Sequence, residues 1–233
     1  MISLAALAPY AKRARTAIRS GCDLCGAAIG EPHGHLVDVV ERRLRCACGA
    51  CRFLFERPGQ RYRRVPDRYL RDPRFELDDA RWSALQIPVR IAFLFRPSSF
   101  DAKPARREEG PAATATQYEN APPVPVNDRW VAFYPGPAGA TESLLGLESW
   151  RDFAAACPLA AEVRADVEAL LVAGDGRGRY RCFLVPIDAC YELVGRVKRT
   201  WRGFDGGEEA WRAIEGFFNR VESRCESLPE PPA

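Results

Sequence analysis

Five cysteines lie close together near the start of the chain, and their spacing is that of a metal site. Cys22 and Cys25 form one CxxC pair, Cys48 and Cys51 form a second, and Cys46 precedes the second pair by two residues. A tetrahedral zinc or iron site takes four ligands, so one cysteine is left over. A CxxC turn wraps two thiolates around one ion, whereas Cys46 and Cys48 are separated by a single residue and lack that turn. We predict Cys22, Cys25, Cys48 and Cys51 as the metal ligands, with Cys46 as the alternative ligand in place of Cys48.

The residues around the two pairs favour zinc over iron. Arg52 follows the second pair where a rubredoxin-type iron site usually has glycine, and residues 26–45 contain no Phe, Tyr or Trp to shield an iron centre. We therefore predict Zn²⁺ bound in a zinc-ribbon-like module, with Fe as the alternative cofactor. Zinc bound by four thiolates has no open coordination position, so such a site contributes folding energy and not catalysis.

The two histidines of the chain, His33 and His35, both lie between the cysteine pairs. One of them could be a metal ligand or a proton donor beside the thiolates. Because four cysteines already saturate one ion, we interpret both as ordinary residues of a hairpin.

Few residues remain from which an enzyme site could be built. With no other histidine, a Ser-His-Asp or Cys-His arrangement would have to include the cysteine module, and no phosphate-binding, nucleotide-binding or metalloprotease motif is found. The Gly- and Pro-rich segment 133–143, "FYPGPAGATES", could receive a ligand, but we interpret it as a turn followed by a helix cap. We predict no catalytic and no cofactor-binding residues besides the metal ligands, and favour a protein that is not an enzyme.

Composition and charge narrow the class of protein. The chain has 233 residues, of which 47% are hydrophobic, and a net charge of +3, which indicates a globular protein without a strongly basic character. The Arg-rich stretch 52–74 also contains acidic residues and prolines, so we expect internal ion pairs there and no nucleic-acid partner. No run of eighteen apolar residues predicts a membrane span, and the N-terminus lacks the order of charges of a secretory signal. We predict a cytoplasmic protein, where a reducing environment favours thiolate ligation over disulfides.

The elements that must position these residues form five successive regions. We predict a basic N-terminal helix (1–20), the zinc-ribbon-like module (21–57), a basic connecting arm (58–84), an α+β domain (85–225) with a flexible Pro- and Ala-rich insertion (101–128), and a disordered tail (226–233). In the α+β domain we expect a mostly antiparallel sheet of about five strands, at residues 87–95, 129–134, 166–173, 179–186 and 190–199. Helices are expected from Leu147 and over 206–224. In the second helix the apolar residues recur at helical spacing and fall on one face: Ala210, Trp211, Ile214, Phe217, Phe218 and Val221.

Several motifs, taken in order along nearly the whole chain, resemble an uncharacterised bacterial domain-of-unknown-function family often encoded beside nickel-iron (NiFe) hydrogenase genes. They include "CDLCG", "HGHLVD", "CACGACRFLF", "RYRRVPDRYLRDPRF", "VPIDACYELVG" and "WRGFDGGEEAW". The resemblance implies an accessory or assembly role for a NiFe hydrogenase, with a hydrogenase subunit or maturation factor as protein partner. Two hypotheses follow: a zinc-binding scaffold that acts through protein contacts, or a redox or metal-transfer protein that uses the cysteine cluster.

Overall fold

The computed structural model describes residues 21–55, 61–98, 130–143 and 147–229. The chain divides after Arg64 into two compact units, each with its own hydrophobic core. The predicted N-terminal helix at 1–20 and the predicted insertion at 101–128 lie outside the described residues.

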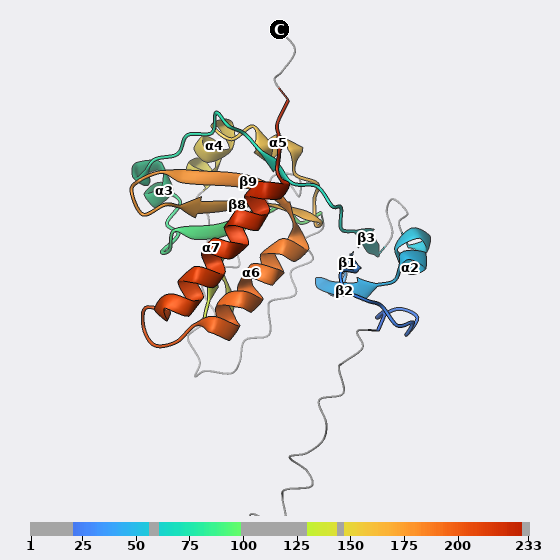
Figure 1. The fold of residues 1–233 in the computed structure, drawn as a ribbon. Helices are drawn as coiled ribbons and strands as arrows, with labels where there is room; N and C mark the ends of the chain where they lie inside the picture. The colour runs from blue at the N-terminus through green and yellow to red at the C-terminus, as the bar shows by residue number, and fades with distance from the viewer. Residues whose placement is uncertain (1–20, 56–60, 99–129, 144–146, 230–233) are drawn as a thin grey trace, which may run out of the picture. The chain divides into compact units, whose positions relative to one another are not determined.

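Within its described residues, 21–55 and 61–64, the first unit contains a three-stranded antiparallel sheet and one short helix (Figure 1). Strand β1 (Gly34–Asp38) lies between β2 (Arg43–Ala47) and β3 (Tyr62–Arg64), and helix α2 (Gly49–Leu54) follows β2 directly. Strand β3 comes from the segment that we predicted as a connecting arm. The arm prediction was wrong at this point, because backbone pairing with β1 makes residues 62–64 part of the cysteine module.

A buried carboxylate joins the parts of this small sheet. Asp38, at the end of β1, has no exposed surface, and its Oδ1 accepts hydrogen bonds from the backbone N–H groups of Val40 and Glu41. The guanidinium of Arg61 donates to both carboxylate oxygens, from Nε at 2.9 and 3.0 Å and from Nη2 at 2.6 Å. These bonds from Arg61, which outweigh the effect of burial, lower the pKa of Asp38. One anion therefore ties the β1–β2 turn to the residue that precedes β3.

The second unit contains a seven-stranded sheet, which confirms the α+β class. Its order is β10-β4-β9-β8-β5-β6-β7, and every pair of neighbours is antiparallel except β10 with β4. The strands are β4 (Leu70–Arg71), β5 (Ile91–Phe95), β6 (Val131–Gly136), β7 (Gly139–Ser143), β8 (Glu168–Gly174), β9 (Tyr180–Pro186) and β10 (Glu226–Ser227). Four of them, β5, β6, β8 and β9, were predicted from runs of apolar residues.

The fifth predicted strand, at 190–199, was wrong: these residues belong to helix α6 (Ile187–Thr200). The buried residues Cys190, Leu193 and Val197 are spaced by three and four positions, which is the spacing of one helix face. On the exposed side, Arg196 pairs with Glu192 one turn earlier at 2.6 Å. The sheet has seven strands and not about five because three strands, β4, β7 and β10, were not predicted. Strands β4 and β10 are only two residues long, and β7 and β10 lie at the edges of the sheet.

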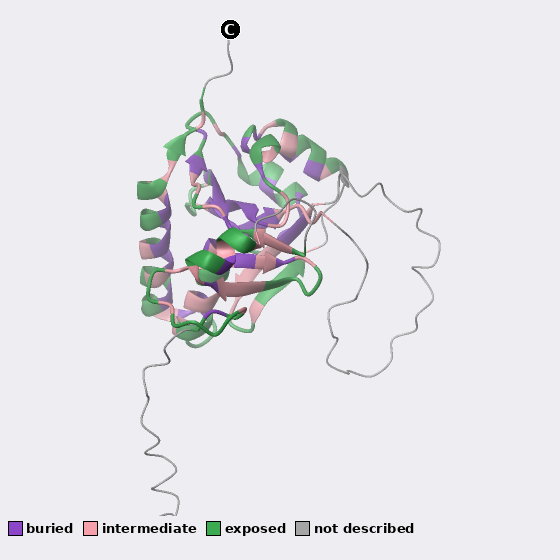
Figure 2. Ribbon diagram, turned by 90° about the vertical axis from the view of Figure 1, so that its right-hand side faces the viewer, coloured by how far each residue is buried: buried purple, intermediate pink, exposed green. Residues whose placement is uncertain are grey.

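Helices cover both faces of the large sheet (Figure 1). Helices α3 (Asp79–Ala84), α4 (Leu147–Ala155) and α5 (Leu159–Glu162) share one core with side chains such as Leu170 and Leu184. On the other face, Phe183 of β9 contacts Phe218 of α7 (Gly207–Arg224), with ring centroids 6.4 Å apart, and α6 packs beside α7. Figure 2 shows that the buried residues are concentrated in the central strands. Strands that are buried on both faces have nearly continuous runs of apolar residues in the sequence.

Two further predictions for the second unit are corrected by the structure. The predicted disordered tail begins too early, because Glu226–Ser227 form β10 and Leu228 packs against the core. Residues 133–143 form most of the β6–β7 hairpin and not a turn followed by a helix cap. Among the described residues, no helix is both long and apolar enough to cross a membrane.

Candidate metal centre

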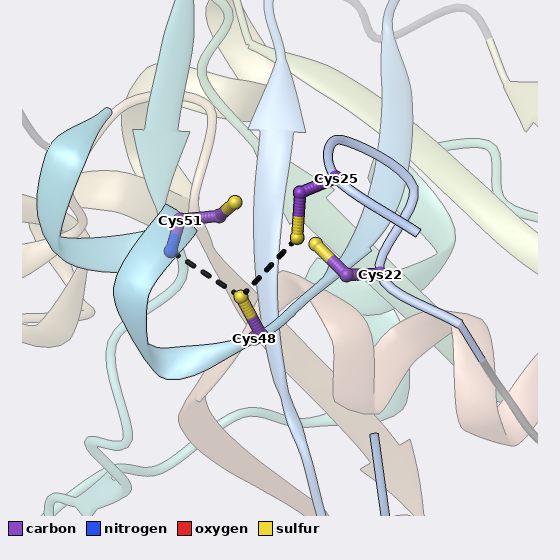
Figure 3. A group of neighbouring side chains, drawn as sticks. All are labelled: Cys22, Cys25, Cys48 and Cys51. Carbon is purple, nitrogen blue, oxygen red and sulfur yellow. Dashed lines mark hydrogen bonds between the residues drawn. The ribbon is translucent and has the colours of Figure 1, made fainter. Parts of the chain in front are cut away.

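The fold of the first unit brings the four predicted cysteines together (Figure 3). Their sulfur atoms all lie within 4.8 Å of one another, and the sulfurs of Cys25 and Cys48 are 3.7 Å apart. Cys22 and Cys51 are buried, Cys48 is half-buried and Cys25 is exposed, and none is in a disulfide. We call Cys22, Cys25, Cys48 and Cys51 the quartet.

The first pair lies in a tight turn that its backbone closes. The N–H of Cys22 donates to the carbonyl of Ala27 and the N–H of Gly26 donates to the carbonyl of Cys22, each at 2.8 Å. Gly26 has a φ of +73°, in the left-handed region that glycine enters without steric cost. The local sequence CxxCG therefore produces the turn that presents two sulfurs to one point.

The second pair differs from the first, because it begins a helix. Cys48 precedes α2, and its sulfur accepts a hydrogen bond from the N–H of Cys51 at 3.5 Å. Helix α2 packs closely on β1 at Gly34, where an added Cβ would lie 2.2 Å from the guanidinium of Arg52. The two halves of the site are thus a turn and a helix start, where we expected two similar turns.

The sulfur spacing is that of a tetrahedral metal–thiolate site. Zn–S bonds of about 2.3 Å at tetrahedral angles place the sulfurs about 3.8 Å apart, and Cys25 and Cys48 are separated by 3.7 Å. The sulfurs of Cys157 and Cys182 are equally close, but these two cysteines lie in the apolar core of the second unit. The convergence of four sulfurs, and not one short contact, therefore identifies the quartet as able to hold a metal ion.

Hydrogen bonds prepare one member of the quartet as a thiolate. Burial raises the pKa of Cys22, but N–H groups of Cys48, Leu24 and Cys25 directed at its sulfur outweigh burial and lower the pKa to about 6. Burial and the neighbouring thiols raise the pKa of Cys51 to about 12. A metal ion that binds all four sulfurs would therefore displace protons from the quartet, as thiolate ligation requires.

The structure places Cys46 outside the quartet. In the antiparallel pair β1–β2, Cys46 is the register partner of His35, and its sulfur groups with ring nitrogens of His33 and His35. Burial and the carboxylates of Asp23 and Glu31 raise the pKa of the Cys46 thiol. Of the two ligand sets that the sequence left open, the one with Cys48 is assembled.

The grouping of Cys46 with both histidines was not predicted from the sequence. We interpreted His33 and His35 as ordinary hairpin residues and treated Cys46 as a spare thiol. A signal was present, since His33 and His35 are two positions apart and residues at this spacing share one face of a strand. Only the register of β1 and β2, however, places Cys46 opposite them.

Comparison with known families covers almost the whole of this fold. Residues 21–122 and 123–225 match DUF5947, described as a family of unknown function. The chain belongs to this family. The predicted membership of a domain family of unknown function is therefore confirmed, and DUF5947 spans the cysteine module as well as most of the second unit. No curated protein and no solved structure matches the chain significantly.

Proposed function

We propose that this DUF5947 protein is a zinc-binding accessory protein whose first unit is a metal-stabilised scaffold for protein contacts. The convergence of four cysteine sulfurs within 4.8 Å is the observation on which the proposal rests. Four thiolates fill the coordination shell of zinc, so the ion would hold the module together and leave no position for a substrate. Such a centre suits a scaffold.

Exposed apolar side chains on the same unit support a role in protein contacts. Phe53 and Leu54 of α2 are 81% and 61% exposed, and Val40 in the β1–β2 turn is 71% exposed. Phe53 and Leu54 lie two and three residues after Cys51 in the same helix, so the metal centre would fix the helix that presents them. Exposed aromatic and aliphatic residues of this kind are typical of protein-binding surfaces.

The proposed partner is a subunit or maturation factor of a NiFe hydrogenase or a similar metalloenzyme, in the cytoplasm. This part of the proposal is supported by the resemblance of the sequence motifs to a family encoded beside hydrogenase genes.

Metal content tests the zinc site. We expect the native protein to hold one tightly bound zinc that Cys48→Ser loses and Cys46→Ser retains. Cys46 and Cys48 are both half-buried and lie two positions apart, so each variant is the matched control of the other. Loss of the tightly bound zinc with Cys46→Ser, or no metal in the native protein, would refute the quartet.

Hydrogenase maturation in cells tests the partner. We expect the double variant Phe53→Asp and Leu54→Asp to retain zinc but to lose hydrogenase assembly, since charge on this surface would oppose an apolar contact. Trp211→Asp, which changes a side chain 53% exposed on the second unit, is the matched control. Full hydrogenase activity in cells that lack the protein would disprove the partner.

A second candidate function is redox chemistry or metal transfer at the quartet. The exposure of Cys25 favours it, because an exposed ligand is open to exchange with another protein or with solvent. Iron bound by the same four thiolates would give a coloured, reducible protein, whereas the zinc protein is colourless. Thiol exchange by Cys46 is less favoured, because its raised pKa lowers the fraction of the reactive thiolate.

A further inference from the structure

A second group of metal-binding side chains lies in the first unit, separate from the quartet. One ring nitrogen of His33, one of His35 and the sulfur of Cys46 lie within 4.8 Å of one another. His35 and Cys46 are register partners on β1 and β2, so their side chains lie on the same side of the sheet, and His33 immediately precedes β1. The two imidazole rings have centroids 4.9 Å apart.

The contacts of His33 leave one ring nitrogen without a partner, as a metal ligand requires. Its side chain is only 10% exposed, and its Nδ1 lies 3.1 Å from the carbonyl oxygen of Gly30 and 3.3 Å from Oε1 of Glu31. Because a carbonyl oxygen can only accept, Nδ1 must be the nitrogen that carries hydrogen. A histidine that binds a metal through one ring nitrogen usually donates a hydrogen bond from the other ring nitrogen to a carbonyl or a carboxylate. This hydrogen bond fixes the orientation of the ring and its tautomer.

The other nitrogen of His33 is buried without a partner. Nε2 has no accessible surface and no hydrogen-bond partner among the residues that the structure describes. A buried polar atom without a partner costs free energy, and such atoms are rare in native proteins unless an ion or a water satisfies them. In the neutral ring with hydrogen on Nδ1, Nε2 keeps a lone pair that no described residue uses.

The third side chain is held in place by the turn of the first cysteine pair. The backbone N–H of Cys46 donates to Oδ2 of Asp23 at 2.7 Å, and the N–H of Asp23 donates to the carbonyl of Cys46 at 2.9 Å. The carboxylates of Asp23 and Glu31 also supply negative charge near the Cys46 sulfur, which favours a bound cation.

We propose that His33, through Nε2, together with His35 and Cys46 binds a second divalent transition metal ion of the zinc class. Two imidazoles and one thiolate are ligands of intermediate softness, which suit Zn²⁺ and its substitute Co²⁺ better than Mg²⁺ or Ca²⁺. Zn–N bonds of about 2.0 Å and Zn–S bonds of about 2.3 Å at tetrahedral angles place a nitrogen and a sulfur about 3.6 Å apart. Small side-chain rotations would therefore close the present group around an ion. Three protein ligands leave one coordination position open.

The open position distinguishes this site from the quartet. An ion with four thiolates is enclosed, whereas an ion with three protein ligands takes a water or a ligand from outside as its fourth. The second ion is therefore the one that can accept a ligand from outside the protein. This inference goes beyond the scaffold role of the quartet and does not depend on it.

Stepwise loading with Co²⁺ tests the second site in the full chain. Under reducing, oxygen-free conditions we expect the metal-free protein to bind two equivalents of Co²⁺, the first at the quartet and the second more weakly. Cys46→Ser and the pair His33→Ala with His35→Ala should each bind one equivalent and keep the spectrum of four-thiolate cobalt. Cys225→Ser, which removes a half-buried cysteine from the second unit, should still bind two. A native protein that binds one equivalent, or variants that all bind two, would overturn the proposal.

Nuclear magnetic resonance of the histidines tests the same site without substitution. The chain has two histidines, so their ring nitrogens are readily assigned. We expect the second equivalent of Zn²⁺, and not the first, to shift Nε2 of His33 and one ring nitrogen of His35 to metal-bound positions. No shift with either equivalent would refute the site formed by His33, His35 and Cys46. Shifts that occur already with the first equivalent would refute the quartet as the tighter site, and not this group.

Discussion

Asp38 shows how one buried anion determines the conformation of the small sheet. Asp38 has no exposed surface, and its carboxylate accepts hydrogen bonds from Arg61 and from two backbone N–H groups. Arg61 is 44% exposed and also pairs with Glu41, so it would stay partly solvated if Asp38 lost its charge. The carboxylate, and not the guanidinium, is therefore the group that depends on this contact.

We predict that Asp38→Asn lowers the free energy of unfolding of the first unit by about 2 kcal/mol, since hydrogen bonds to a charged group are lost. The pKa of Asp38 is lowered in the folded chain, so its contribution is present above the ordinary pKa of aspartate, about 3.9, and is lost as pH falls through the lower folded pKa. The difference in melting temperature between the two proteins should shrink between pH 6 and pH 3. Glu41→Gln, at the exposed partner of Arg61, is the control, and a constant difference over this pH range would contradict the account.

For the candidate metal centre, the sequence predicted which cysteines come together but not the structure around them. The quartet follows from CxxC spacing, because that spacing determines a local turn, and Gly26 adopts the expected left-handed φ. The group of His33, His35 and Cys46 was missed because it depends on which residues of two strands are paired. A register cannot be read from spacing alone, since a shift of one residue would turn Cys46 to the opposite face.

Among the elements, α7 shows the value and the limit of an apolar period. Phe217 and Phe218 were predicted on its buried face and are 1% and 3% exposed, but Trp211, predicted on the same face, is 53% exposed. Trp211 begins the second turn of the helix. Its Nε1 donates to the carbonyl of Asp205, and its ring centroid lies 6.2 Å from that of Trp201.

We predict that Phe217→Ala lowers the free energy of unfolding of the second unit by about 3–5 kcal/mol, because a large cavity opens in the core. Trp211→Ala should cost about 1 kcal/mol or less, as expected for an exposed side chain. Urea unfolding of the two variants measures both values. Equal losses would show that α7 does not bury the face described here.

The misassigned helix α6 shows why short apolar segments are ambiguous. Residues 190–199 include Tyr191, Val194 and Val197, which are residue types common in strands, but the buried positions are three and four residues apart, as on one helix face. The tertiary structure decides between the two, because α6 packs against the paired strands β8 and β9 and against α7. Strands β4 and β10, at one end of the sheet, are two residues long, and their sequences contain no strand signal.

For the whole molecule, the two units differ in how far their own cores can stabilise them. The four buried residues of the first core are Cys22, Leu36, Ala47 and Cys51, so half of them are candidate metal ligands. The second unit has a core of many large side chains on both faces of its sheet. A small core of this kind usually needs a metal or a disulfide, so we expect the fold of the first unit to depend on a metal.

We predict that a strong chelator unfolds the first unit and leaves the second folded. Hydrogen exchange followed by mass spectrometry should show loss of amide protection in β1 and β2, and unchanged protection in β8 and β9. Added Zn²⁺ should restore the lost protection, which controls for damage by the chelator. Persistent protection of β1 and β2 in the metal-free chain would show that the unit folds without metal.

X-ray absorption at the zinc edge, on the full chain loaded with one equivalent of Zn²⁺, tests the central claim most directly. A zinc held by Cys22, Cys25, Cys48 and Cys51 has four sulfur neighbours at about 2.3 Å and no nitrogen neighbour. That result would establish the closed four-thiolate centre on which the scaffold role depends. A shell with nitrogen, or with fewer than four sulfurs, would contradict it, because the first ion would then be bound outside the quartet.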